Sequence, residues 1–388
     1  MTTGQATRRD SMDDSAAGRV LIAGGGIAGL AMRRALQRRG IPSLTLEQRP
    51  TPADAGLAIN LPGNAVQALG QLGLSEALRN IGSPVRRREY RTGSGRLLFA
   101  IDEAAFWGEE ACPRCVRRAD LLRLLALDLP PTDLRPGSEI SAVRQMPRGV
   151  AIELQDGTAE TGGFLVGADG VHSRVRRDTF GASVLGAAML APASWRFMAP
   201  NPGLDAWTIW AGSNGLFLLI PVDHGKVYGW VSVSEAAGRG QDLAAFQNVF
   251  TSFPRLVRDT LDVVLAKPGA LYHSPLEEVR IPSWTRDRVA LVGDAAHATA
   301  PVWAQGAALA LEDALVLAAL LAERMDWGTI GAEYEAIRRP RVAHVQAMTD
   351  RLSRTARMPS WAKNLLLPMI GPRSYRATYS PLRTPVSA

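Results

Sequence analysis

The chain has 388 residues, of which 46% are hydrophobic and 21% are charged. This is the composition of an ordinary globular protein, and it excludes disordered, collagen-like and coiled-coil chains. The length predicts about two or three domains. The net charge of +7 comes almost entirely from scattered arginines, because only three residues are lysine (Lys226, Lys267 and Lys363). Without a basic cluster, we expect no nucleic-acid partner.

The two cysteines, Cys112 and Cys115, form a Cys-Pro-Arg-Cys sequence. They are too few for a four-ligand zinc site or a disulfide framework, so we expect no metal. A redox pair and two half-buried thiols both stay open. No segment reaches the roughly 18 apolar residues of a membrane span, and residues 1–19 lack the apolar core of a signal peptide. We expect a disordered leader over 1–19 and a cytoplasmic protein with no integral membrane segment.

A βαβ unit is predicted where the pattern of apolar residues begins. Residues 20–23 form a short apolar run typical of a buried parallel strand, residues 30–39 predict a helix that ends at Gly40, and residues 43–47 predict a second strand.

Glycines stand between this first strand and the helix, in the order Gly24, Gly26 and Gly29, with Ile27 and Ala28 before the last. In this context the G-x-G-x-x-G pattern permits a tight turn, close approach of the backbone to a pyrophosphate, and phosphate binding at the helix N-terminus. Glu47 follows Gly29 by 18 residues and is placed to accept hydrogen bonds from ribose hydroxyls. The sequence therefore predicts dinucleotide binding, and the alternative is an ordinary glycine turn.

The sequence pattern changes in the middle of the chain. Residues 87–90 and 96–99 flank a glycine-rich turn and predict a hairpin, and residues 119–127 predict a helix. A strand over 150–154, a turn at 155–157 and a short strand after it predict a meander before the apolar run 164–166. Between about 183 and 276, alternating strands (207–211, 216–220 and 227–233) and a helix near 242–252 predict a mostly antiparallel second domain.

The last third is predicted to be mostly helical. Residues 289–292 form another buried strand, and residues 306–324 predict a long helix. Helices near 329–357 and 359–369 follow, and the remaining residues predict a loose tail. The apolar segment 361–370 could contact a membrane, a second subunit or the chain's own surface; the last is favoured.

Two further motifs accompany the glycine motif. Residues 165–176 contain Asp169-Gly170 after an apolar run, and residues 288–301 contain Gly293-Asp294 after another. The three ordered motifs resemble those of the FAD-dependent single-component aromatic hydroxylases, the family typified by p-hydroxybenzoate hydroxylase. The resemblance covers essentially residues 20–355.

The resemblance implies roles for individual residues. Asp294, with Gly293, would bind the ribityl chain of FAD, and Arg118 would contact the flavin nucleotide. Asp169 would serve the pyrophosphate and the reduced nicotinamide donor, although a turn acid that caps the next helix near Ser173 is the alternative. Gln48, beside Glu47, is added as a cofactor contact.

A loop and helix start after Asp294 complete the implied cofactor site, through Pro301, Gln305, Gly306, Ala307 and Ala308. In the family this helix start aims N–H groups at the flavin C2 carbonyl, where its dipole stabilises the reduced ring. The chain departs from the family pattern with Ala304 in place of Gly and Ala308 in place of Asn. A Cβ at position 304 calls for a different loop path.

The implied fold class is α/β: an FAD-binding Rossmann-like, three-layer βαβ domain, a second, mostly antiparallel β-sheet substrate domain, and C-terminal helices. We expect the FAD-binding domain to be discontinuous and to comprise 20–85, 100–182 and 277–330. The substrate domain then comprises 86–99 and 183–276, the C-terminal helices 331–373, and the tail 374–388.

The resemblance also implies the chemistry. NAD(P)H would bind transiently as electron donor, since no second glycine motif is present; whether NADH or NADPH is used stays open. Oxygen would add at flavin C4a, and the hydroperoxide would hydroxylate an aromatic or polycyclic, fairly apolar small molecule. No side chain is expected to be catalytic with certainty; for His297, a structural hydrogen bond is favoured over catalysis. The protein would be a monomer or a homodimer.

Aromatic and apolar side chains are the candidates for the substrate pocket, namely Trp210, Phe217, Leu219, Trp230 and Trp303, and each of them could equally be core. Two other functions remain as alternatives. One is a flavin dehydrogenase or epoxidase of the same fold. The other is a flavoprotein that has lost oxygenation and acts as a binding protein, which the alanines at 304 and 308 keep open.

Overall fold

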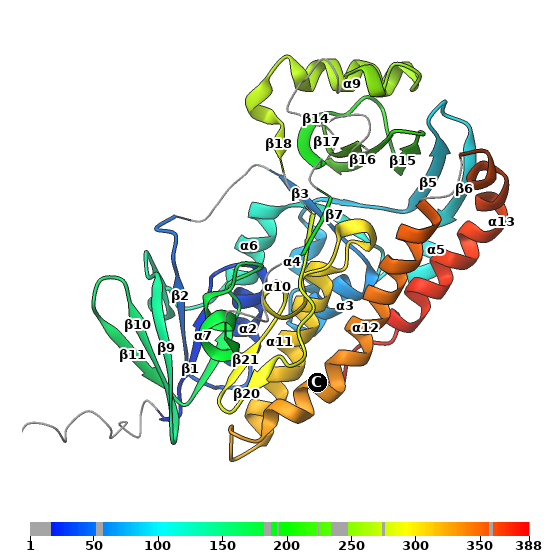
Figure 1. Ribbon diagram of the computed structural model, residues 1–388. Helices are drawn as coiled ribbons and strands as arrows, with labels where there is room; N and C mark the ends of the chain where they lie inside the picture. The colour runs from blue at the N-terminus through cyan, green and yellow to red at the C-terminus, as the bar shows by residue number, and fades with distance from the viewer. Residues whose placement is uncertain are drawn as a thin grey trace, which may run out of the picture.

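The computed structural model describes residues 17–51, 57–181, 188–191, 194–223, 225–233, 247–273, 276–356 and 360–387. Two larger sheets and three smaller ones are combined with long helices (Figure 1). Most of the predicted leader, residues 1–16, lies outside the described residues, as do residues 242–246 of the helix predicted near 242–252; of the rest of that helix, residues 247–249 are helical.

A six-stranded sheet forms the first unit. Its strand order is β20 (Thr285–Arg286), β21 (Val289–Leu291), β12 (Phe164–Gly167), β1 (Val20–Ala23), β2 (Ser43–Glu47) and β8 (Leu134–Pro136). All neighbours are parallel except β20 and β21. Every residue of β1 and β12 is buried, which explains why these strands are continuous apolar runs. The predicted βαβ opening is confirmed.

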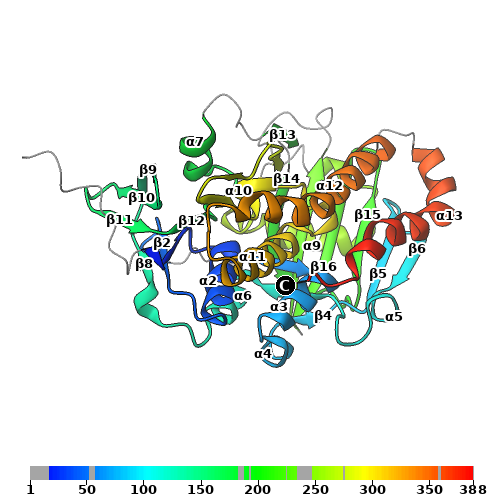
Figure 2. The same ribbon diagram turned by 90° about the horizontal axis from the view of Figure 1, so that it is seen from below.

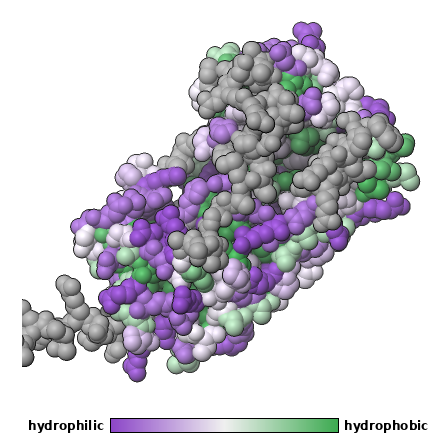
Figure 3. Space-filling model, in the orientation of Figure 1, coloured by the Kyte–Doolittle hydropathy of each residue, from purple (hydrophilic) through white to green (hydrophobic). Residues whose placement is uncertain are grey.

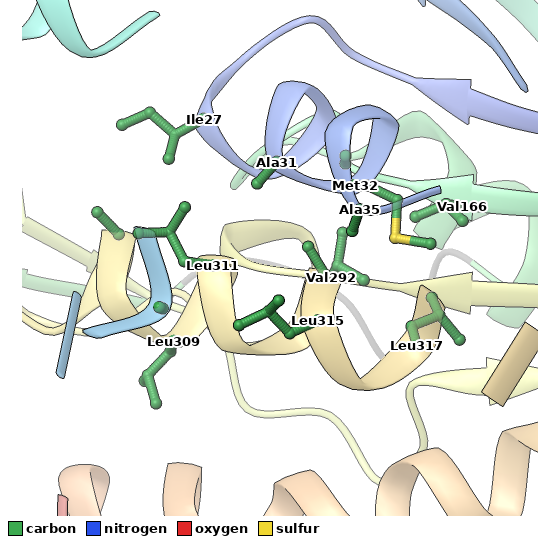
Figure 4. Close-up of a cluster of buried hydrophobic side chains, with 14 of the residues drawn as sticks. Ile27, Ala31, Met32, Ala35, Val166, Val292, Leu309, Leu311, Leu315 and Leu317 are labelled. Carbon is green, nitrogen blue, oxygen red and sulfur yellow. The ribbon is translucent and has the colours of Figure 1, made fainter. Parts of the chain in front are cut away.

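Helices cover one face of this sheet and a three-stranded meander covers the other (Figure 1). The helices are α2 (Ile27–Gln37) and α11 (Gly306–Glu323), and the meander comprises β9 (Ile140–Met146), β10 (Gly149–Leu154) and β11 (Ala159–Gly162). Figure 4 shows small side chains, Ala31 and Ala35, on the face of α2 that approaches α11, with Val292 between the helices. Small residues let the two helices pack closely, which fixes the start of α11 relative to the start of α2.

Further helices surround α11. Figure 2 shows it between α12 (Ile330–Ala356) on one side and α2 and α3 (Gly63–Gln71) on the other. Two short helices follow sheet strands: α6 (Arg118–Ala126) follows β7 (Arg114–Arg117), and α7 (Arg174–Phe180) follows β12. The remaining short helices are α4 (Ser75–Arg79), α5 (Glu103–Trp107) and α10 (Asp294–His297).

A seven-stranded sheet forms the second unit. Its order is β18 (Tyr272–His273), β14 (Ser194–Pro200), β17 (Lys226–Val233), β16 (Gly215–Asp223), β15 (Trp207–Ala211), β5 (Arg87–Thr92) and β6 (Leu97–Asp102). Its neighbours are antiparallel except β15 and β5. The predicted hairpin is β5–β6, and it joins this sheet from far away in the sequence. Helix α9 (Arg255–Leu265), which the sequence analysis did not identify, covers one face.

Three small strands approach the other face of the seven-stranded sheet: β3 (Ala58–Leu61), β7 and β4 (Ser83–Pro84). Ala58, Val85 and Cys115 pack there against side chains of the large sheet. A two-stranded sheet of β13 (Ala188–Ala191) and β19 (Leu276–Glu278) completes the set. The face of the seven-stranded sheet that lies opposite α9 is called the inner face below.

The C-terminal segment corrects one expectation. Helix α13 spans Ser360–Tyr379 and continues through Pro368 and Pro372, whereas the predicted helix ended near residue 369. The loose tail expected from residue 374 is wrong, because Tyr375, Tyr379 and Leu382 are buried. Arg341 of α12 also donates hydrogen bonds to the carbonyls of Pro381, Leu382 and Thr384.

The outer side of α13 is apolar and exposed. Leu365, Met369 and Ile370 are among its exposed hydrophobic residues, and Figure 3 shows hydrophobic surface at this end of the molecule. These three side chains therefore do not dock on the chain's own surface, contrary to the favoured expectation. Among the helices described, none is long and apolar enough to cross a membrane.

Candidate functional site

The predicted motifs meet at one edge of the six-stranded sheet. Strands β1, β2, β12 and β21 run parallel, and Ala23 at the end of β1 is paired with Gly167 of β12 and Leu46 of β2. Their carboxyl ends carry the glycine loop, Glu47, Asp169 and Asp294 respectively. Ligands of open parallel sheets bind at this edge, so the sheet brings together residues that are up to 270 positions apart.

The three glycines of the loop are subject to different structural constraints. Gly24 has φ +102°, and a Cβ there would lie 2.6 Å from the Ala168 carbonyl oxygen. A Cβ on Gly29 would lie 1.8 Å from the Gly24 carbonyl oxygen, so Gly29 is required for α2 to pack against the loop. Gly26 has φ −77°, which any residue can adopt, and a Cβ there meets nothing within 4 Å.

Neither the conformation nor the packing of the chain therefore requires glycine at position 26. Gly26 is the N-cap of α2 and has no side-chain cap of its own. A bare backbone at a helix N-terminus fits a diphosphate that approaches closely. This observation supports the cofactor interpretation over an ordinary glycine turn.

Glu47 ties the end of β2 to the glycine loop. Its Oε2 accepts a hydrogen bond of 2.6 Å from the Gly25 N–H, and its Oε1 accepts one of 2.9 Å from the Arg49 N–H. Each carboxylate oxygen can accept a second hydrogen bond, so contact with a ribose stays a prediction. Gln48 is exposed beside it.

Asp169 caps a helix, as the alternative interpretation had it. Its Oδ2 accepts hydrogen bonds from the N–H groups of Arg174 and Val175, at 2.7 and 3.0 Å, and Ser173 accepts one from Arg176. Its Oδ1 is buried and has no hydrogen-bond partner among the described residues. Burial raises the pKa of this carboxyl group. One oxygen thus supports α7, and the other is a buried acceptor without a partner among the described residues.

Asp294 and Arg118 interact electrostatically. Both side chains are exposed to solvent, yet burial raises the pKa of Asp294 and lowers that of Arg118. Each charge favours the ionised form of the other, and Arg196 acts on both of them. The combination suits a ligand with hydroxyl groups and phosphates.

The start of α11 lies beside Asp294. A Cβ on Gly306 would lie 3.6 Å from Asp294 Oδ1. Ala307 and Ala308 follow and are buried. The Gln305 side chain is buried as well and exchanges two hydrogen bonds with the Asn64 amide, at 3.0 and 3.2 Å. Any cofactor contact of Gln305 is therefore made by its backbone.

The loop before α11 contains a backbone conformation that is unusual for alanine. Ala304 has φ +53° and ψ 31°, the left-handed region that favours glycine. The alanine adopts this conformation at a cost in strain, and a loop path different from that of the family stays a prediction. In the short turn Pro301–Trp303, the side chains of Pro301 and Val302 are exposed.

Replacing Ala304 with glycine should raise the free energy of unfolding by up to about 1 kcal/mol, because the left-handed conformation costs alanine roughly 1–2 kcal/mol and part of the gain is offset by glycine's freedom in the unfolded chain. Urea denaturation of the two apoproteins measures the difference. A destabilised Ala304→Gly variant would show that the loop carries no such strain.

His297 has a structural position. It is buried, and its Nε2 lies 2.7 Å from Asp313 Oδ2. Asp313 also accepts hydrogen bonds from the Gly293 N–H and from Arg338 Nε, both at 2.8 Å. This buried polar network fixes the turn that precedes Asp294. The sequence analysis did not identify Asp313 or Arg338; the match of Glu312-Asp313 to the family pattern was the signal for the first.

The pocket prediction chose the wrong face of the sheet for three residues. Trp210, Phe217 and Leu219 belong to the core between the sheet and α9. Trp230 lies on the inner face, paired with Leu218 of β16. Successive strand residues point to opposite faces, and the chain is apolar on both, so its alternation could not tell them apart.

Trp303 is part of the main core rather than an exposed pocket wall. Its ring is only 6% exposed and meets the Tyr379 ring edge-on at 5.9 Å between centroids. The cysteines are likewise core residues: Cys112 and Cys115 are free thiols and buried, and burial raises the pKa of both. High thiol pKa values oppose a redox role.

Comparison with known proteins identifies the family. The family described as "FAD binding domain" matches residues 18–350. The chain is 32% identical over 347 residues to 3-amino-4-hydroxybenzoate 2-monooxygenase PtnB3 of Streptomyces platensis, covering 84% of this chain and 85% of that protein. It is 31% identical over 352 residues to 3-hydroxybenzoate 6-hydroxylase 1 of Aquipseudomonas alcaligenes, covering 84% and 86%.

The structural comparison agrees with the sequence comparison. Klebsiella pneumoniae HpxO, whose structure was solved with FAD and uric acid, superimposes with a TM-score of 0.77 and 26% identity over 94% of this chain and 92% of that one. The glycine loop, the strand-end acids and the helix start of α11 thus stand in a fold that holds FAD. The chain belongs to the family of FAD-dependent aromatic hydroxylases.

Proposed function

We propose that this flavoenzyme hydroxylates a largely apolar aromatic compound that carries one anionic or hydrogen-bond-accepting group, bound between FAD and the inner face of the seven-stranded sheet. The observation that carries this proposal is a row of paired residues across that face. Cross-strand pairing places its members on the same side of the sheet, and they are Arg196, Trp230, Leu218, Ile209 and Tyr90.

Within this row Arg196 is the one charged residue. It is half-buried, and its Nε has no hydrogen-bond partner among the described residues. It acts electrostatically on Asp294 and Tyr228, which puts it on the cofactor side of the face. A guanidinium in such a place binds a carboxylate, phenolate or carbonyl oxygen. The apolar neighbours Trp230, Leu218 and Ile209 suit the ring.

Residue roles follow from the geometry of the site. The N-terminus of α2 at Gly26 would hold the diphosphate, Asp294 the ribityl chain, and the first N–H groups of α11 the flavin ring. FAD, reduced by NAD(P)H, supplies the oxygen chemistry of this family. The protein's part is to orient the aromatic ring and to exclude water, for which the apolar inner face and Val302 are suited.

The experiment is a screen on the FAD-loaded protein. Aromatic acids, their neutral amides and unsubstituted rings are tested for stimulation of NAD(P)H oxidation, and products are analysed under ¹⁸O₂. Stimulation by an aromatic acid, with label in a new ring hydroxyl, is the expected result. Stimulation without incorporated label would favour a dehydrogenase, label in an epoxide would favour an epoxidase, and no stimulation at all would favour a binding protein.

Arg196→Gln should raise the KM for an acidic substrate by about 10-fold or more, because a hydrogen bond to a charged group is lost. The KM for the neutral amide should change far less. Arg91→Gln is a matched control, since Arg91 is paired with Trp210, whose ring packs toward α9. Equal effects of Arg196→Gln on the acid and the amide would contradict the assigned contact.

A further inference from the structure

The loop over residues 301–305 carries strain next to the cofactor site. Ala304 stands in the left-handed region, and Gly306 begins α11 two residues later, close to Asp294. A strained backbone persists only where surrounding contacts determine it. Two side chains provide such contacts, one at each end of the strained residue.

The first contact is the amide pair of Gln305 and Asn64, described above. The second comes from the C-terminal helix: the Tyr379 hydroxyl donates a hydrogen bond of 2.8 Å to the Trp303 carbonyl oxygen. The ring of Tyr379 also packs edge-on against the Trp303 ring. Tyr379 is fully buried, and burial raises its pKa, so the hydroxyl stays protonated and can donate.

Tyr379 is itself held rigidly. Its ring lies 4.6 Å from the Tyr375 ring and 5.7 Å from the Trp107 ring, centroid to centroid. The Arg88 guanidinium lies 5.7 Å from its centroid and is paired with Glu103. A donor held on three sides by these groups can impose a position on the carbonyl that it contacts.

We propose that Tyr379 is a positioning residue, whose hydroxyl holds the Trp303 carbonyl and thereby fixes the 301–305 loop and the first turn of α11 against bound FAD. The inference rests on the proposed cofactor placement at the start of α11. It gives the C-terminal helix a part in the cofactor site, although Tyr379 lies 75 residues after Ala304 in the chain.

Tyr379→Phe tests the contact, because it removes one hydroxyl and keeps the ring. The FAD dissociation constant, measured by quenching of flavin fluorescence, should rise about 5-fold, the usual effect of one lost hydrogen bond. The visible bands of the bound flavin should shift, and the share of NAD(P)H that ends as hydrogen peroxide in the presence of substrate should increase. The first two readouts need no substrate.

Tyr375→Phe is the matched control. It removes the neighbouring hydroxyl, which donates to Glu103 and accepts from Trp107 Nε1, and it keeps the ring that packs against Tyr379. It should therefore lower thermal stability while leaving the FAD affinity and the flavin spectrum unchanged. The proposal is overturned if Tyr379→Phe binds FAD with wild-type affinity and spectrum, or if Tyr375→Phe reproduces its effects. A failed substrate screen would overturn the proposed substrate only, since FAD affinity and spectrum are measured without one.

Discussion

Gly26→Val should abolish stable FAD binding and leave the apoprotein folded, whereas Gly29→Ala should destabilise the apoprotein itself. At position 26 a Cβ meets no protein atom within 4 Å, and it would project where the diphosphate is proposed to lie. At position 29 a Cβ would lie 1.8 Å from the Gly24 carbonyl oxygen. For Gly26→Val we expect the FAD dissociation constant to rise at least about 100-fold. For Gly29→Ala we expect the free energy of unfolding to fall by about 3 kcal/mol, as in an overpacked core.

Fluorescence titration with FAD and thermal unfolding of the apoproteins separate the two effects. Gly269→Val serves as control, because Gly269 also has open space around it and lies away from the glycine loop. It should leave FAD affinity and stability close to wild type. Wild-type FAD affinity in Gly26→Val would contradict the cofactor interpretation of this glycine and favour an ordinary glycine turn.

The cofactor edge was predictable because its information is local. Buried parallel strands are short apolar runs, so β1, β2, β12 and β21 could be placed within a residue or so of their observed bounds. Motif residues that directly follow such strands must meet at the carboxyl edge of the sheet. The sequence could not show which oxygen of Asp169 caps α7, because that depends on interatomic distances, and a sequence pattern contains no such information.

The substrate side was predictable only in outline. Residues 216–220 are all apolar, so alternation separates Leu216 and Leu218 from Phe217 and Leu219 but does not say which pair faces the cofactor. That depends on α9, which was not identified. Tyr379 was missed for a related reason: it lay in the predicted loose tail, and the long-range contact with Trp303 has no local pattern.

Asp313→Asn should cost about 3–5 kcal/mol of stability at pH 7, the usual loss when one partner of a buried ion pair is removed. Arg338 would lose the carboxylate that accepts from its Nε and would retain Glu312, which lies 2.9 Å from Arg338 Nη2. FAD affinity should fall too, because Asp313 accepts from the Gly293 N–H beside Asp294. Asp326→Asn, at an exposed pair with Arg288, is the control and should cost less than about 1 kcal/mol.

The lowered pKa of Asp313 determines how its contribution to stability changes with pH. Burial alone would raise the pKa of Asp313, but His297 and Arg338 hold it at about 2, below the ordinary value of 3.8. A carboxyl group with a lowered pKa stabilises the fold fully above its unfolded value and loses that contribution as the pH falls through the folded value. Wild type should therefore lose about 2 kcal/mol of Asp313's contribution between pH 4 and pH 2, a loss that Asp313→Asn lacks. Urea denaturation at a series of pH values measures the gap between the two proteins, and a gap that stays constant down to pH 2 would mean that the ionised carboxylate does not carry the stabilisation.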